Sequence, residues 1–195
     1  EVGDIGAARF SVTRSQIDDI LGEPLGSLQA QVTAPQLIDL ARIVDRLAPD
    51  TAFATWFRKA APLLAPASMS ITVNSAMQDG KPNTVIGLTG KANATNFDTR
   101  IDLAGVPAAW RQADVKIAAD LKSYDATGLA RQILLDQAET ALEGGASLRF
   151  EASGVPEAGL ASKFAGTLGG LALRTEGKIL VPPDAAPQFT GTFGI

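Results

Sequence analysis

The chain has 195 residues, 46% of them hydrophobic, and its 17 basic and 21 acidic side chains give a net charge of −4. It contains no histidine and no cysteine, which excludes Ser-His and Cys-His nucleophilic catalysis, thiolate or imidazole metal sites, and disulfides. The longest cluster of basic residues is Arg58-Lys59, so the sequence predicts no nucleic-acid binding.

A pattern of a strand followed by a short helix occurs three times, over residues 9–21, 28–40 and 115–129. The first two copies align without gaps over nine residues, and the third matches them in layout. Recurrence of one such unit is typical of elongated repeat scaffolds. We therefore interpret residues 1–67 as strand-helix repeats.

Two amphipathic helices are predicted in this first segment. One covers Pro35 to Ala48 and the other covers Thr51 to about Leu64, because apolar residues recur at helical spacing in both. Trp56 and Phe57 make the second helix aromatic on one side. Packing against a sheet is a better interpretation of this stripe than a position in a membrane interface.

From Ser68 onward the hydrophobic period changes to two, which predicts antiparallel strands with one apolar and one polar face. Turn residues over 78–83 predict a hairpin loop, and a helical stretch is expected from Asp125 to about Leu142. The last residues, Phe189 to Ile195, alternate without a following turn. We therefore interpret residues 68–195 as an antiparallel β-sheet segment that continues beyond the fragment. Further strands are expected over residues 68–74, 84–90, 97–103, 114–121, 148–152 and 171–181.

The predicted fold class is α+β, mainly β: a curved, repeat-like antiparallel sheet of one-sided strands with interspersed short helices. Such a sheet must bury its apolar face on helices, on a second sheet or around an apolar guest. The predicted helices are too few to cover about six to eight strands, so part of the face is expected to remain for a ligand. The candidate lining is Ile71, Val73, Ile101, Leu103, Val115, Ile117, Leu148, Phe150, Leu171 and Leu173. For each of these side chains, a closed core is an equally good interpretation.

Several phrases resemble the periplasmic repeat region of the AsmA family. They are Leu25–Val32, Trp56–Ala67, Thr99–Gly105 and Asp114–Ser123, together with the ending Pro187–Ile195. The resemblance implies a bacterial cell-envelope protein in the periplasm, with an inner-membrane anchor outside this fragment. It also implies an apolar β-groove that handles or transports phospholipid and contributes to outer-membrane assembly. The family offers no catalytic motif, so no catalytic residue, metal ligand or cofactor is assigned.

Two function classes follow. In the first, phospholipid or another acyl-chain lipid lies on the apolar face and gains about 0.8 kcal/mol per buried methylene, with envelope proteins as further partners. In the second, the chain is a structural or protein-interaction repeat module of a larger extracytoplasmic protein. A carboxylate-dependent hydrolase ranks last, because Asp98 and Asp102 on one strand are separated by about 13 Å, too far for paired carboxylates.

Overall fold

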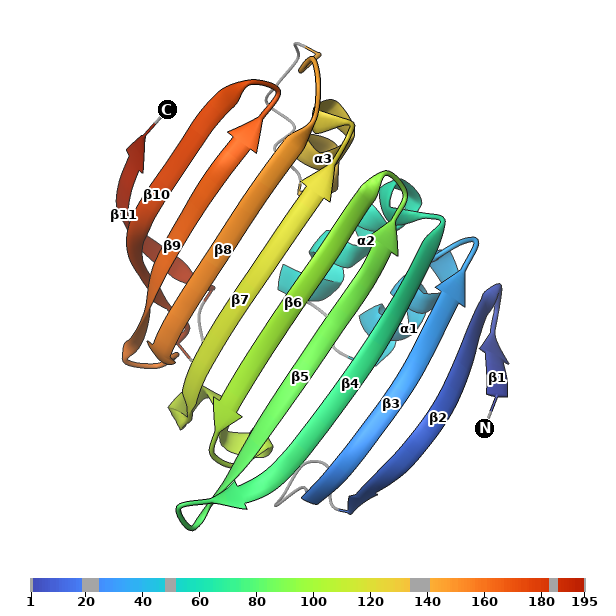
Figure 1. The fold of residues 1–195 in the computed structure, drawn as a ribbon, viewed down its shortest axis with the longest axis vertical. Coiled ribbons are helices and arrows are strands. Elements are labelled where there is room, and N and C mark those ends of the chain that lie inside the picture. The colour runs from blue at the N-terminus through green and yellow to red at the C-terminus, as the bar shows by residue number, and fades with distance from the viewer. Residues whose placement is uncertain (1, 19–24, 48–51, 134–140, 183–185, 195) are drawn as a thin grey trace.

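The computed structural model describes residues 2–18, 25–47, 52–133, 141–182 and 186–194. These residues form one curved antiparallel sheet of eleven strands that follow one another in chain order (Figure 1). The predicted fold class is confirmed. The strands are β1 (Val2–Ile5), β2 (Ala8–Asp18), β3 (Leu25–Ala34), β4 (Ala67–Gln78), β5 (Lys81–Ala92), β6 (Thr95–Ala104), β7 (Asp114–Ser123), β8 (Ala146–Val155), β9 (Gly159–Leu168), β10 (Leu171–Leu180) and β11 (Gln188–Gly194).

The strand register places the apolar side chains on one face of the sheet. One row of directly opposed residues runs from Val32 through Met69, Gly90 and Phe97 to Leu121. Because side chains alternate between faces, a slip of one residue would move a whole apolar set into water. The alternation of apolar and polar residues along each strand therefore determines the register in which neighbouring strands pair.

The described helices, α1 (Ile38–Leu47), α2 (Ala52–Leu64) and α3 (Ala126–Gln132), all lie on that apolar face (Figure 1). A short 3-10 helix, η1 (Pro107–Gln112), connects β6 to β7. None of the described helices is long and apolar enough to cross a membrane.

Alanines bring the helix pair α1 and α2 close to the sheet. Ala41 of α1 and Ala61 of α2 are fully buried against Ala8 and Ala34 of β2 and β3. Small side chains at all four positions allow the helices to approach the strands closely. This cluster covers one end of strands β2 to β4.

The third helix covers the neighbouring strands. Asp125 caps it by accepting a hydrogen bond from the Gly128 backbone N–H at 2.8 Å, as an N-cap side chain does. Leu129 is 1% exposed and packs against Leu148 and Leu168. The helices thus cover the same end of the sheet on β2 to β4 and on β8 and β9.

Most local predictions agree with this structure. The second and third strand-helix patterns become β3 with α1 and β7 with α3. The first does not, because β2 continues as a strand to Asp18, and the rest of that pattern lies outside the described residues. Strand β9 was missed, since its inward positions include Ser162 and Gly166, which give the alternation little contrast. The predicted segments 1–67 and 68–195 share one sheet, since β3 pairs with β4.

Candidate lipid-binding face of the sheet

The middle of the apolar face carries a continuous band of aliphatic side chains, which we call the apolar strip. Its members lie on strands β3 to β8 and each is half-buried rather than fully buried. They are Leu28, Ile71, Val73, Ile86, Leu88, Ile101, Ile117 and Phe150.

The register makes the strip continuous. Leu28, Val73, Ile86, Ile101 and Ile117 are direct neighbours on five successive strands. From β3 to β8 the strip crosses five strand spacings, or about 24 Å. The hydrocarbon layer of one membrane leaflet is about 15 Å thick, so the strip is long enough for an extended acyl chain.

Buried clusters border the strip at both ends of the strands. The helix-covered clusters lie at one end, and Leu103, Val115 and Leu160 form a buried cluster with Ala113 at the other. Residues in a closed core at mid-strand are normally buried completely by their neighbours. The strip is therefore an apolar surface that remains partly open between two closed borders.

All ten candidate residues named from the sequence lie on this face, as their register shows. The buried ones, Leu103, Val115 and Leu148, belong to the borders. Leu171 is 47% exposed at the helix-covered end. The other six are half-buried: Ile71, Val73, Ile101, Ile117, Phe150 and Leu173.

Sequence reasoning missed Leu28, Ile86 and Leu88, which complete the strip. The alternation around Leu28 was readable, because polar Ser27 and Gln29 flank it. Ile86 was harder to assign because Val85 before it is also apolar. Val85 lies on the opposite face, in the hollow described below.

A buried amide ties the helices to the sheet beside the strip. Gln132 of α3 is 4% exposed, and its Nε2 donates to the carbonyl oxygens of Leu63 (3.0 Å) and Ala92 (3.2 Å). Its Oε1 accepts from the Thr95 hydroxyl at 2.7 Å, and its backbone carbonyl accepts from the Trp56 indole N–H at 3.1 Å. One side chain thus connects α2, α3 and the β5–β6 hairpin with its polar atoms satisfied.

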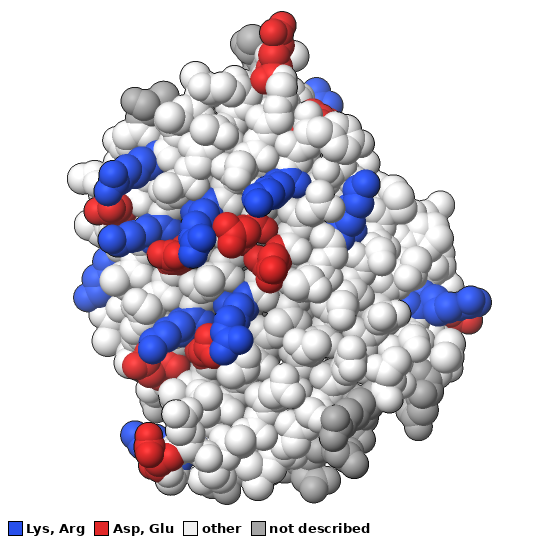
Figure 2. All heavy atoms as spheres, viewed as in Figure 1, with Lys and Arg blue, Asp and Glu red and all other residues white. Residues whose placement is uncertain are grey.

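The opposite face of the sheet is polar, and its charges gather over β6 to β10 (Figure 2). The same arrangement occurs on three alternate strands: an Arg and an acidic residue two positions later. The pairs are Arg100–Asp102 at 2.7 Å, Arg149–Glu151 at 2.8 Å and Arg174–Glu176 at 2.7 Å. Residues two apart on a strand point to the same side, so each pair lies along its own strand.

One of these ion pairs changes how its carboxylate titrates. The hydrogen bond from Arg174 is the main reason that the pKa of Glu176 is lowered, and the positive charges of Arg174 and Lys163 add to it. Hydrogen bonding to Asp102 likewise raises the pKa of Arg100. The Glu176 carboxylate is therefore held ionised, which is unsuitable for a general acid.

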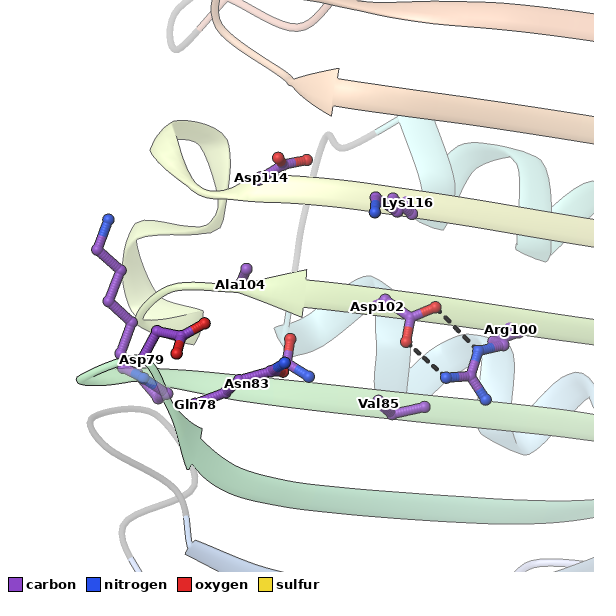
Figure 3. Close-up of a pocket in the computed structure, with 11 residues that line it drawn as sticks. Gln78, Asp79, Asn83, Val85, Arg100, Asp102, Ala104, Asp114 and Lys116 are labelled. Atoms are coloured by element: carbon purple, nitrogen blue, oxygen red, sulfur yellow. Dashed lines mark hydrogen bonds and ion pairs between the residues drawn. The ribbon is translucent and has the colours of Figure 1, made fainter.

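A hollow with a volume of about 590 Å³ also lies on this polar face (Figure 3). Asp102 points toward Arg100 and receives two hydrogen bonds from it, at 2.7 and 2.9 Å. Together with Asp102, Asp79 and Asp114 form the acidic part of the lining of this hollow. Among the described residues, no group of three or more His, Cys, Asp or Glu side chains could hold a metal ion.

Comparison with protein families, curated proteins and solved structures finds no match for this chain. The function of the chain is therefore inferred from the geometry of its two faces and from the resemblance in sequence.

Proposed function

We propose that this chain is a non-catalytic segment of an AsmA-like bacterial envelope protein that holds the acyl chains of phospholipid along the apolar strip. The observation that carries the proposal is that the strip is continuous over six strands and only half-buried. Apolar side chains that remain open in a row on a folded protein commonly mark a binding surface.

Burial of methylenes is the proposed source of affinity. Each methylene removed from water contributes about 0.8 kcal/mol, so ten in contact with the strip supply about 8 kcal/mol before the cost of ordering the chain. The strip carries no charge, so it selects for an acyl chain and not for one headgroup. In this proposal the protein lies in the periplasm, anchored to the inner membrane by a segment outside this chain, and serves phospholipid handling and outer-membrane assembly.

The competing function is a structural or protein-interaction module whose apolar face is filled by its own residues. The burial of Leu103, Val115 and Leu148 favours this function at the borders of the strip. The half-buried residues between those borders favour the lipid function.

Two adjacent residues of β7 provide the test, because they lie on opposite faces. Ile117 is in the strip, whereas Ala118 lies on the polar face between Arg100 and Glu151. We expect Ile117→Asp to lose at least about tenfold in co-purified phospholipid, measured by lipid mass spectrometry, and Ala118→Asp to retain it, since a charge in an apolar site is strongly unfavourable.

Ile117→Thr keeps the β-branched shape and separates lipid loss from unfolding. It should reduce lipid loading while its circular dichroism spectrum stays that of the parent. Equal loading of the Ile117 and Ala118 variants, or a parent without phospholipid, would contradict the proposal.

A further inference from the structure

The connection between β6 and β7 carries an arginine whose side chain lacks an acceptor. Arg111 lies in η1 and is half-buried. Its Nε is buried, yet it has no hydrogen-bond partner among the described residues. Unpaired buried N–H groups are rare in folded proteins, and the missing acceptor is commonly a water molecule or an ion. Because a guanidinium is always charged, an anion is the acceptor that suits it best.

No carboxylate of the described residues neutralises this arginine. The ion pairs of that part of the chain involve other arginines, such as Arg100 and Arg149. Asp114, which is close to Arg111 in sequence, lines the hollow on the polar face. The guanidinium lies instead over the ring of Trp110, with 5.0 Å between its Cζ and the ring centroid. A guanidinium held by a ring face keeps its in-plane N–H groups for other acceptors.

The 3-10 helix that carries Arg111 is next to the buried border of the apolar strip. Ala113, two residues later, packs in one cluster with Val115, and the strip residue Ile117 packs against that cluster. The backbone carbonyl of Arg111 accepts from the backbone N–H of Glu157 at 3.0 Å, which holds η1 beside the turn between β8 and β9. The arginine is thus fixed at the border of the strip that lies opposite the helices.

We propose that Arg111 binds the phosphate group of a lipid whose acyl chain lies on the apolar strip, an inference that rests on the proposed function. Phosphate oxygens match the guanidinium fork, because they accept two parallel N–H bonds and carry the opposite charge. The edge formed by Nε and one Nη donates these bonds. Because Nε is covered, a rotation at the end of the side chain brings this edge to the ligand.

The surroundings of Arg111 resemble those at the headgroup level of a membrane. Trp110 is 40% exposed and Val106 is 36% exposed, so an aromatic and an aliphatic side chain lie open in the same connection. Tryptophan is enriched where hydrocarbon meets headgroups, because its ring is amphipathic. A lipid bound here therefore finds an apolar contact and a phosphate ligand close together.

The distance along β7 agrees with the size of a phospholipid. Ile117 is three residues beyond Asp114, the first residue of the strand, so it lies about 10 Å from that end. The headgroup region of each bilayer leaflet extends about 5 to 7 Å beyond the hydrocarbon. A lipid with its phosphate at Arg111 thus places its first methylenes over Val115 and the following ones on the strip.

Two lipids that differ only in the phosphate test the proposal. They are lysophosphatidic acid and monoacylglycerol with the same lauroyl chain, titrated below their micelle concentrations by isothermal titration calorimetry. The parent chain should bind lysophosphatidic acid at least about tenfold more tightly, because hydrogen bonds to charged groups are strong. Arg111→Gln should lose most of this preference. Arg111→Lys, which keeps the charge without the planar fork, should retain part of it.

Arg46→Gln is the matched control, because Arg46 is exposed in the last turn of α1. This variant removes the same charge far from η1 and should keep the preference of the parent. Circular dichroism shows whether each variant is folded. Undiminished preference in folded Arg111→Gln, or an equal loss in Arg46→Gln, would overturn the assignment of the phosphate to Arg111.

The remaining outcomes separate this inference from the proposed function. A parent chain that binds both lipids equally would overturn the role of Arg111 and leave the proposed function standing, whereas one that binds neither lipid would overturn both. Inorganic phosphate should bind at least about a hundredfold more weakly than lysophosphatidic acid, because it has no methylenes to bury. Equal affinity for inorganic phosphate would show that the ligand is a free anion, which would overturn the assignment to a lipid.

Discussion

Replacing Gln132 with methionine should detach the helices from the sheet at one defined point. Methionine has a similar length but cannot donate to Leu63 and Ala92 or accept from the hydroxyl of Thr95, a residue that is only 3% exposed. The change leaves two carbonyl oxygens and one hydroxyl without this partner. The Leu63 carbonyl oxygen still accepts from the Asn93 side-chain amide at 3.4 Å. Each of the other two buried polar groups costs about 1 to 3 kcal/mol when left unpaired, so we expect a loss of about 2 to 6 kcal/mol in the free energy of unfolding.

Urea unfolding followed by circular dichroism measures this loss as a shift of the midpoint at constant slope. Arg131→Met is the matched control, because Arg131 precedes Gln132 in α3 and is exposed. It should change stability by less than about 0.5 kcal/mol.

A second variant isolates the hydrogen bond to Thr95. Combining Gln132→Met with Thr95→Val removes both partners, and the double variant should be less destabilised than the sum of the two single variants. A loss for Gln132→Met below about 1 kcal/mol, or no greater than that for Arg131→Met, would show that these hydrogen bonds do not hold the helices to the sheet.

Two further predictions concern the sheet itself. A Cβ at Gly90 would overlap the Ser68 carbonyl oxygen and lie 2.8 Å from the Met69 Cα, whereas a Cβ at Gly3 would meet nothing within 4 Å. Gly90→Ala should therefore lower the free energy of unfolding by about 1 to 3 kcal/mol, and Gly3→Ala by much less. Urea unfolding measures both changes. The lowered pKa of Glu176 means that its ion pair contributes stability above pH 4.5, which is lost as pH falls through the lower pKa of the folded state. Between about pH 5 and pH 2 the parent should thus lose more thermal stability than Glu176→Gln, and equal losses would contradict this assignment.

The sequence carried enough information to predict one-sided antiparallel strands and the face that each apolar residue occupies. Alternation of side chains is a local property, so Ile71, Val73, Ile101 and Ile117 could be assigned to one face without knowledge of their neighbours. Helices α1 and α2 were predictable for the same reason. The alternation of apolar and polar residues does not identify a strand whose inward residues are small or polar. Strand β9 is such a case, because its Ser162 is buried and donates to the Gly177 carbonyl oxygen.

The extent to which each apolar side chain is buried was not predictable from the sequence, because it depends on which distant segments cover that part of the sheet. Leu148 and Phe150 have the same period on β8, yet Leu148 is 2% exposed beneath α3 and Phe150 is half-buried in the strip. The role of Gln132 was equally hidden. Its four hydrogen-bond partners come from residues 37 to 76 positions away in the chain.

The most direct test of the lipid proposal is to ask which face of the sheet a phospholipid touches. We would label the isoleucine, leucine and valine methyl groups for NMR and add phospholipid with a paramagnetic group on its acyl chain. We expect strong relaxation of the methyl signals of Ile71, Ile101 and Ile117, and much weaker relaxation at Val85 on the polar face. Equal relaxation on both faces, or relaxation confined to exposed side chains such as Val2 and Leu25, would contradict it.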